Sequence, residues 1–406
     1  MNRWIRRCFV YLLFLGLILS ITVFPLLTTP VSSQTTRPIK HEIRGVWLTN
    51  VNSGVLFVPW GIERALKQLS SLNFNTIYPV VWNRGYTFYN SKIAKKVIGK
   101  ESEPFLRFMH GGKDVLSQII KLSANKGITV IPWFEYGFMA PPNSELALLH
   151  PDWLTKGRVN NKSIQETALD KQFLGNRYIS KQAWLNPLHP EVQKLIKSLI
   201  LEVVSKYNVN GFQVDDHFGM PVQFGYDPFT IKLYQLEHQG KTPPDDPYNS
   251  EWMRWRSDKI TAFMRDINRA VKAVKPKAKI SLSPNPQNFA YKYYLQDWDT
   301  WVKTGLVDEL ILQVYRDDTK SFFTELQQPA VQFALGKIPV AVGISSGTWG
   351  NPVEIKQIKK QVETVRQHQF SGVSFFYWES LWGYIAPEAP QKRRRVLSQL
   401  FNDGSS

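Results

Sequence analysis

The sequence predicts one large α/β domain, a (β/α)8 TIM-type barrel with long loops after strands 3 and 4. From Glu42 onward, short apolar strands alternate with helical stretches, and the alternation repeats eight times. Such alternation is typical of a parallel sheet covered by helices, and eight units are the number that closes a barrel. No repeat, low-complexity block or Ser/Gly-rich linker divides residues 42–402, so we expect a single barrel there.

Each expected strand is a short apolar run, and the eight runs are Ile43–Thr49, Thr76–Trp82, Thr129–Glu135, Gly211–Asp216, Lys279–Ser283, Glu309–Tyr315, Pro339–Ser345 and Gly372–Trp378. The expected helices lie near Trp60–Leu72, Lys113–Asn125, Pro190–Tyr207, Ser250–Val274, Trp298–Lys303, Lys320–Leu335, Pro352–His368 and Glu388–Phe401. Pro190 and Pro352 fall where a first helical turn accepts proline, because the missing N–H has no partner there.

Two connections are unusually long, and both follow the carboxyl ends of expected strands. They are Gly137–Leu188 after the third strand and Gly219–Asn249 after the fourth. Long loops at this rim are where a barrel enzyme builds its substrate groove. A doubly wound open sheet is the alternative fold, but Thr49–Gly54 lacks the Gly-rich phosphate loop that such a fold would carry.

The first 33 residues have the pattern of an export signal. A basic start at Met1–Arg7 precedes an apolar run from Cys8 to Leu27, and small residues follow it. The run is also near the length that spans a bilayer, so an uncleaved membrane anchor stays open. We expect an exported protein, periplasmic or extracellular, with residues 34–41 as a tether. Cys8 is the only cysteine, so the exported part has no disulfide.

The charge balance indicates an anionic partner. Without residues 1–33 the chain keeps 47 basic against 33 acidic residues. Such an excess attracts an acidic glycan, a cell wall or a membrane surface. Export and the lack of helix-turn-helix, zinc-finger or RNA-binding signatures argue against nucleic acid. We expect a polysaccharide partner, with contact to a membrane only through an uncleaved N-terminal segment.

Carboxylates, amides and aromatic residues collect at the expected strand ends. The set comprises Asn50, Trp82, Trp133, Glu135, Asp215, Asp216, His217, Gln313, Tyr315, Asp317, Trp378 and Glu379. Glycoside cleavage needs one carboxylic acid to protonate the leaving oxygen and one carboxylate to attack or to activate water. Aromatic faces stack on sugar rings and amides hold hydroxyls. The rim therefore predicts a glycosidase.

Asp215 is the leading candidate for the nucleophile or charge-stabilising group. Strand side chains alternate, so Gln213 and Asp215 face the interior while Phe212 and Val214 face the helices. Asp216 is then on the other face, where it would orient Asp215 or bind substrate. A solvated acidic turn is the alternative interpretation of the same residues.

Glu135 is the first candidate for the general acid, because Trp133 and Tyr136 would desolvate it and raise its pKa. Glu379 competes for this role, and Asp317 comes third. The expected substrate-binding residues are Asn50, Trp82, Trp133, His217, Gln313, Tyr315 and Trp378.

Metal and serine chemistry are less well supported, and we expect neither a metal site nor a cofactor. The seven histidines show no H-x3-H or H-E-x-x-H spacing, although Asp216 and His217 resemble part of a metal-dependent deacetylase site. The letters of Gly343–Gly347 match a nucleophile elbow around Ser345, but no helix follows directly.

Several segments resemble the family-10-like glycosyl hydrolases: Glu42–Thr49, Trp184–Glu191, Asn210–Phe218, Ser281–Pro284 and Gln313–Tyr315. The resemblance spans about residues 42–380 and implies a TIM-type barrel with glycoside hydrolase activity. Some members act on bacterial cell-wall glycan. Many have asparagine at the position of Glu135 and a tryptophan-like residue at that of Arg316, so the chain departs from the pattern at both. A nucleophile on the fourth strand, as in amylase-like barrels, agrees with Asp215.

These observations favour an exported glycoside hydrolase that cleaves a polysaccharide, with peptidoglycan glycan as the expected substrate. A carbohydrate-binding pseudoenzyme of the cell envelope is the alternative, and a membrane-anchored structural wall protein is a third.

Overall fold

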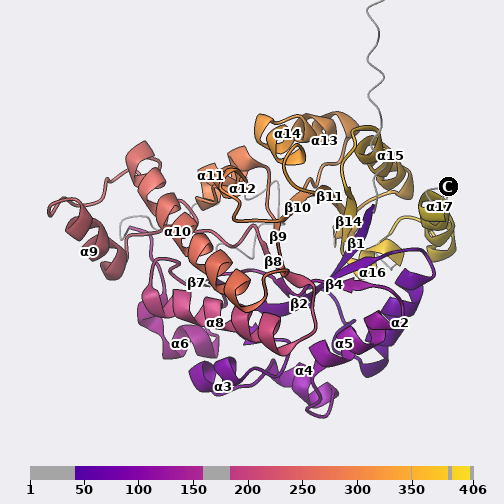
Figure 1. The fold of residues 1–406 in the computed structure, drawn as a ribbon, viewed down its shortest axis with the longest axis horizontal. Helices are drawn as coiled ribbons and strands as arrows, with labels where there is room; N and C mark the ends of the chain where they lie inside the picture. Colours follow the sequence, from indigo (N-terminus) through magenta and orange to yellow (C-terminus); the bar gives the residue numbers. More distant parts are fainter. Residues whose placement is uncertain (1–41, 159–182, 349, 383–385, 403–406) are drawn as a thin grey trace, which may run out of the picture. The chain divides into compact units, whose positions relative to one another are not determined.

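The computed structural model describes residues 42–158, 183–348, 350–382 and 386–402. Eight parallel strand positions form a closed barrel in the order β1-β14-β11-β10-β9-β8-β5-β2, and pairing of β1 with β2 completes the ring. Figure 1 shows the ring with helices around it. The predicted TIM-type barrel is confirmed, and closure excludes the open doubly wound sheet.

The barrel strands agree with the predicted runs except near their ends. They are β1 (Ile43–Leu48), β2 (Thr76–Asn83), β4 (Thr129–Val130) with β5 (Trp133–Phe134), β8 (Gly211–Asp215), β9 (Lys279–Ser283), β10 (Glu309–Gln313), β11 (Val340–Ser345) and β14 (Gly372–Phe376). The third predicted strand is split in two. Pro132 lies in the gap and has no N–H to donate, and the pairing of β2 with β5 shifts register between Val80 and Trp82.

The helices that follow the barrel strands are α2 (Pro59–Ser70), α5 (Val115–Ala124), α8 (Pro190–Lys206), α10 (Ser250–Val274), α12 (Trp298–Lys303), α13 (Thr319–Leu326), α14 (Pro329–Leu335), α15 (Ile355–Gln367) and α17 (Pro390–Asn402). Two predictions were wrong in detail. The single helix expected over Lys320–Leu335 is two helices, because Pro329 begins a new one. Pro352 does not open a helix: it belongs to β13 (Asn351–Pro352), which pairs with β12 (Gly347–Thr348).

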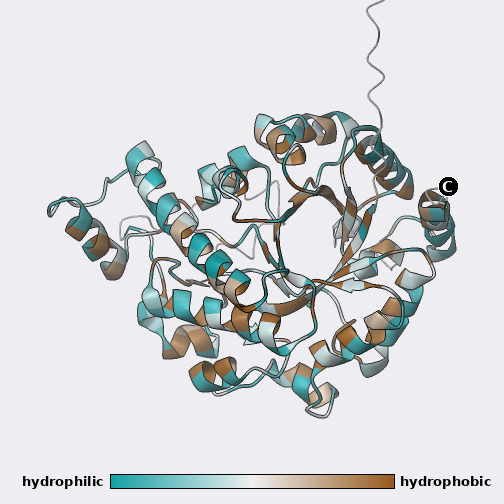
Figure 2. Ribbon diagram, viewed as in Figure 1, coloured by the Kyte–Doolittle hydropathy of each residue, from teal (hydrophilic) through white to brown (hydrophobic). Residues whose placement is uncertain are grey.

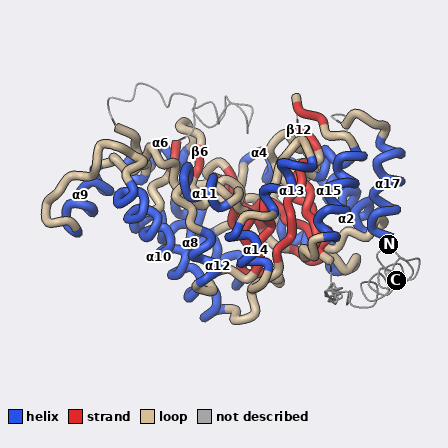
Figure 3. The backbone as a smooth tube through the Cα atoms, turned by 90° about the horizontal axis from the view of Figure 1, so that it is seen from above, coloured by secondary structure: helices blue, strands red, loops and turns tan. Residues whose placement is uncertain are grey.

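The rim connections hold short elements that the sequence pattern did not predict. They are β3 (Tyr86–Thr87), α3 (Lys92–Ile98), α4 (Pro104–Met109), β6 (Met139–Ala140), α6 (Glu145–Leu149), β7 (Ala183–Trp184), α9 (Pro228–Glu237), α11 (Gln287–Tyr294) and α16 (Trp378–Trp382). Figure 3 shows α4, α6, β6 and β12 on one side of the barrel. The loops after the third and fourth strands are long, as predicted, and β6, α6, β7 and α9 lie within them.

The predicted alternation of β8 is present in the core. Phe212 and Val214 are fully buried toward the helices, and the Phe212 ring lies 6.2 Å from that of Phe134. Gln213 points inward, where it accepts from Trp47 Nε1 at 2.7 Å and donates to Ser281 Oγ at 2.9 Å. Gly211 is needed because a Cβ there would lie 1.9 Å from the Lys279 carbonyl oxygen. Figure 2 shows hydrophobic strands inside a ring of helices with hydrophilic outer faces.

The predictions for residues 1–33 and for the tether over 34–41 lie outside the described residues. Among the helices that the structure does describe, none combines the length and the apolar character needed to cross a bilayer.

Candidate active site

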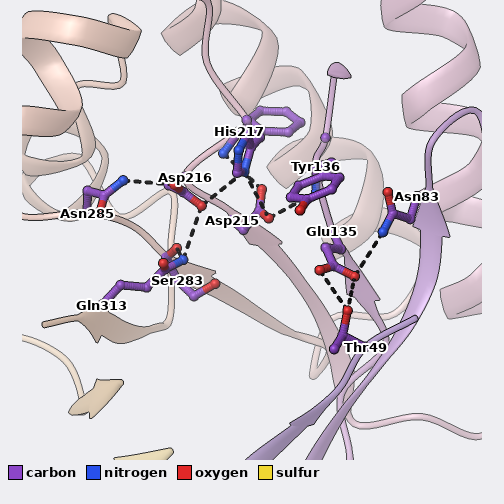
Figure 4. Close-up of polar contacts among 12 residues, drawn as sticks. Thr49, Asn83, Glu135, Tyr136, Asp215, Asp216, His217, Ser283, Asn285 and Gln313 are labelled. Carbon is purple, nitrogen blue, oxygen red and sulfur yellow. Dashed lines mark hydrogen bonds and ion pairs between the residues drawn. The ribbon is translucent and has the colours of Figure 1, made fainter. Parts of the chain in front are cut away.

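Three carboxyl groups from neighbouring strands meet at the barrel mouth. Asp215 ends β8, Asp216 follows it in a turn, and Glu135 follows β5 directly. Because β5 pairs with β8, parallel register brings these strand ends together (Figure 4). All three residues are buried, with exposed fractions of 1% for Glu135, 1% for Asp215 and 8% for Asp216.

Asp216 is held by donors from three elements. Its Oδ2 accepts from Asn285 Nδ2 at 2.8 Å, and its Oδ1 accepts from Gln313 Nε2 at 3.1 Å. His217 Nδ1 lies 3.1 Å from the same Oδ1. Burial alone would raise the pKa of Asp216, but attraction to His217 and these hydrogen bonds outweigh burial and lower it. Asp216 is therefore held ionised.

This placement corrects the predicted orientation of Asp216. The strand ends at Asp215 and the backbone turns, so the alternation of faces does not extend to residue 216. Asp216 consequently reaches Gln313 on β10, across the mouth, instead of pointing away from it.

Asp215 accepts mainly from backbone amides. The N–H of Tyr136 donates to its Oδ2 at 3.0 Å, and the N–H of His217 donates to its Oδ1 at 2.9 Å. His217 Nδ1 lies 3.4 Å from Oδ2. Burial raises the pKa of Asp215 in spite of the His217 charge. Its backbone carbonyl accepts from Gln296 Nε2 at 2.8 Å.

His217 lies between the two aspartates and is itself buried. Burial would lower the pKa of its imidazole, but the charges of Asp216 and Asp215 raise it well above its usual value. The Tyr136 ring packs edge-on at 4.7 Å. Gly137 keeps this contact close, because a Cβ there, at a φ of +36°, would lie 2.8 Å from the His217 carbonyl oxygen. Whereas the sequence predicted a substrate-binding role for His217, its Nδ1 is engaged by the aspartates.

Glu135 lies among neutral donors. Thr49 Oγ1 lies 2.8 Å from both of its carboxyl oxygens, and Asn83 Nδ2 donates to Oε2 at 3.0 Å. Burial raises the pKa of Glu135 to about 8; the Thr49 hydrogen bond opposes this shift and the charge of Asp215 adds to it. Glu135 is therefore protonated at neutral pH, whereas Asp216 is not.

The other predicted binding residues are distributed around this centre. The carboxyl groups of Asp216, Asp215 and Glu135 all act on Tyr315: burial first, and then their charges, raise the pKa of its hydroxyl well above the usual value. Asn50 accepts from Asn83 Nδ2 at 2.7 Å. Trp82 is buried and donates to the Gly137 carbonyl at 2.8 Å, so it supports the loop. The buried Nε1 atoms of Trp133 and Trp378 have no hydrogen-bond partner among the described residues.

The two alternative acids lie apart from this network. Glu379 lies in α16, where its Oε1 accepts from Ser53 Oγ and from the Val55 N–H at 3.2 Å, so it holds the loop after β1. Burial raises its pKa. Asp317 is exposed and forms no hydrogen bond with the three carboxyl groups.

The sequence did not predict the residues that hold the turn of the two aspartates by hydrogen bonds. Gln296 binds the carbonyls of both Asp215 and Phe218, and it lies between α11 and α12, far along the chain. Tyr136 contributes its backbone N–H, which no side-chain pattern reveals. Thr49, Asn83 and Asn285 lie at or just beyond the ends of expected strands, but the local sequence does not show which residues they contact.

One group among the described residues has the spacing of metal ligands. Ligand atoms of Asp215, Asp216 and His217 all lie within 4.8 Å of one another. The same atoms are joined by the short contacts given above, which account for their spacing without an ion.

Comparison with known proteins identifies a glycosyl hydrolase-like family. The sequence model of the family glycosyl hydrolase-like 10 matches residues 42–365. Glycosyl hydrolase DigH of Escherichia coli K12 is 24% identical over 345 residues, which cover 71% of this chain and 70% of DigH. Glycosyl hydrolase YngK of Bacillus subtilis is 23% identical over 315 residues, covering 68% of this chain and 54% of YngK.

Solved structures share the fold at lower identity. The glycoside hydrolase domain of PgaB (BpsB) from Bordetella bronchiseptica superposes with a TM-score of 0.62 at 12% identity, covering 88% of this chain and 98% of that domain. Alpha-L-fucosidase isoenzyme 2 from Paenibacillus thiaminolyticus gives a TM-score of 0.60 at 14% identity, covering 89% of this chain and 49% of the fucosidase. Both are barrels of the same type.

Proposed function

The chain belongs to the glycosyl hydrolase-like 10 family, and we propose that it cleaves glycosidic bonds of a polysaccharide with the buried carboxyl groups at its barrel mouth. The observation that carries this proposal is the meeting of three buried carboxyl groups at the ends of the paired strands β5 and β8, where their surroundings differ. Burial raises the pKa of Glu135 to about 8, while His217 and neutral donors lower the pKa of Asp216. Paired carboxyl groups with separated pKa values are what glycoside hydrolysis requires.

Glu135 is the proton donor in this proposal. It carries its proton at neutral pH and would transfer it to the oxygen of the departing sugar as the bond breaks. The hydroxyl of Thr49 and the amide of Asn83 then stabilise the carboxylate that remains, because both donate to its oxygens.

The ionised partner is Asp216, which lies beside Asp215 in the same turn. Asp216 is the more exposed of the two and has the lowered pKa, so we assign it the contact with the positive charge that develops on the sugar. Water then bonds to the anomeric carbon, and its proton returns to the carboxylate of Glu135. Asp215 is positioned by backbone amides and supports its neighbour through their shared His217. The imidazolium of His217 stabilises the charge of Asp216, because the two groups are in direct contact in a buried site.

The proposed substrate is an anionic wall glycan outside the cytoplasm, with peptidoglycan glycan as the first choice. The basic and apolar pattern of residues 1–33 supports export, and the excess of basic residues in the rest of the chain supports an acidic partner. N-terminal sequencing of the mature protein tests the export signal: a start near Gln34 supports cleavage, and retention of Met1 supports an anchor.

Product analysis is the experiment that tests the activity. The purified protein is incubated with wall sacculi and with a panel of polysaccharides, and released fragments are identified by mass spectrometry. We expect new reducing ends from sacculi with the wild type and not with Asp216→Asn. Equal release by the two proteins would show that the carboxylate cluster is not the catalytic centre.

The low exposure of the cluster favours a second candidate, a carbohydrate-binding protein without turnover. Glu135 is only 1% exposed, and both of its oxygens already accept hydrogen bonds. Full binding of sacculi without any released fragment across the panel would favour this second function over hydrolysis.

A further inference from the structure

Exposed large hydrophobic side chains are concentrated on the side of the barrel that carries the carboxylate cluster. Nine described residues are of this kind, and Val274 and Phe333 are the two that lie elsewhere. The other seven lie in connections or first helical turns that follow barrel strands: Trp60, Phe105, Phe108, Leu148, Leu149, Leu236 and Tyr248. Where exposed apolar side chains lie next to one another, they mark an interaction site.

Three members of this set, Trp60, Phe105 and Phe108, lie in α2 and α4 close to the half-buried Phe57 in sequence or in space, and we call these four residues the aromatic platform. The rings of Phe57 and Phe105 lie 5.5 Å apart, which joins the loop before α2 to α4. Nearby, His110 Nε2 lies 2.8 Å from the Leu56 carbonyl oxygen and fixes α4 against that loop. Trp60 is 62% exposed, Phe105 54% and Phe108 78%. The Phe57–Phe105 contact thus anchors the platform, while Trp60 and Phe108 expose most of their surface.

The segment that carries half of the platform is strongly basic. Lys92–Lys113 contains six basic residues and two acidic ones. Glu101 is already paired with Lys95 at 2.8 Å and with Arg107 at 2.9 Å. Lys96, Lys100 and Lys113 are exposed and form no salt bridge with any described acid. The platform is therefore bordered by cations that are available to an anionic ligand.

Two chain segments connect the hydrogen-bond donors of Glu135 with the aromatic platform. Thr49, which donates to Glu135, directly follows β1 and leads into the loop of Phe57. Asn83, the second donor, ends β2, and Phe88 just beyond it packs against Phe57 at 6.2 Å. A polymer lying across the mouth would therefore meet the aromatic rings next.

We propose that the aromatic platform binds an anionic glycan chain whose neighbouring sugars occupy the barrel mouth. Flat aromatic faces pack against the apolar faces of sugar rings, while the exposed lysines attract the carboxylates of the chain. This inference rests on the proposed function, because it extends the same site. It also implies that the platform strengthens the binding only of glycan chains long enough to reach from the carboxylate cluster to the platform.

Sacculus binding by a variant that does not cleave glycan tests this proposal separately from the proposed hydrolysis. The full chain with Asp216→Asn serves as the background, and co-sedimentation with purified sacculi gives an apparent Kd. Adding Phe105→Ala and Phe108→Ala should weaken binding about tenfold, because two ring contacts are lost. The matched control is Phe333→Ala in the same background, since Phe333 is an exposed phenylalanine on α14 at 38% exposure, away from the platform. This control should leave the Kd unchanged, and equal melting temperatures establish that all variants fold.

Substitution of the exposed lysines is the second part of the experiment. Lys96→Glu with Lys100→Glu should also weaken sacculus binding and reduce its dependence on salt concentration, since fewer ion contacts are made. Unchanged binding in both the aromatic and the lysine variants would overturn the proposal. If these variants lost binding to phosphatidylglycerol vesicles but still bound sacculi, the proposal would be overturned in favour of a lipid surface. Sacculus binding that needs the platform, without fragment release by the wild type, would contradict the proposed hydrolysis and leave the platform standing.

Discussion

Glu135 and Asp216 are buried carboxyl groups at the same barrel mouth, yet their surroundings shift their pKa values in opposite directions. Glu135 meets a hydroxyl and an amide, which are neutral, so burial dominates and its proton is retained. Asp216 meets two amides and the imidazole of His217, and the charge of His217 outweighs burial. Direct contact with the imidazole of His217 therefore distinguishes Asp216 from Glu135, at which the charges of His217 and Arg84 do not overcome burial.

Removal of the charge of Asp216 should have the largest effect on activity. Asp216→Asn keeps the shape of the side chain but removes its charge, so we expect kcat to fall by about 10³- to 10⁴-fold. Fragment release from sacculi measures it. Asp317→Asn is the matched control, because Asp317 is exposed and outside the network, and it should retain wild-type activity. A comparable loss in both variants would point to a general effect of charge.

Replacement of the protonated group should have the next largest effect. Glu135→Gln cannot transfer a proton, so we expect about a 10²- to 10³-fold loss in kcat. The wild type should also lose activity as pH rises through about 8, where Glu135 ionises, and this limb should be absent from the variant. An unchanged alkaline limb in Glu135→Gln would assign that limb to another group.

The same substitution predicts a change in stability with a defined sign. The folded-state pKa of Glu135, about 8, lies above its ordinary value of 4.5, so the folded state binds more protons between these pH values. The stability contribution is present below about pH 4.5 and is lost as pH rises through about 8. Glu135→Gln lacks this loss, so its melting temperature should gain on the wild type between pH 5 and pH 9. A constant difference over that range would contradict the burial effect.

Loss of the shared cation should reduce the difference between the two carboxyl groups. His217→Gln removes the charge that lowers the pKa of Asp216, so the acidic limb of the pH–activity profile should move to higher pH. We expect about a tenfold to 100-fold fall in kcat/KM near neutral pH, with partial recovery at higher pH. An equal loss at every pH would indicate a merely structural role for the histidine.

The smallest effect on activity is expected from Thr49, a neutral hydrogen-bond donor to Glu135. Thr49→Val removes a donor that lowers the pKa of Glu135, so the alkaline limb should move to higher pH. The cost of one buried hydrogen bond is about 1 kcal/mol, which corresponds to a change in activity of about fivefold at most. Thermal unfolding and a pH–activity profile measure the two consequences.

The sequence by itself determined the barrel and the edge where its chemistry lies. Eight apolar runs separated by amphipathic stretches are local patterns, and alternation along β8 correctly placed Phe212 and Val214 against the helices. Long connections after the third and fourth strands were visible for the same reason. Because parallel strands end on one side, the polar residues at the strand ends, among them Glu135, Asp215 and Asp216, were expected at one mouth.

Only the tertiary structure decided what each of these residues meets. Alternation predicts a face only while the strand continues, and the turn after Asp215 brought Asp216 toward Gln313 instead of away from it. The donors of Glu135 come from two other strands, and the Gln296 that binds the carbonyl of Asp215 is 81 residues away along the chain. Protonation depends on burial and on neighbouring charge, which arise when distant segments pack together. For this reason local sequence could nominate the carboxyl groups, but it could not distinguish the acid from the carboxylate.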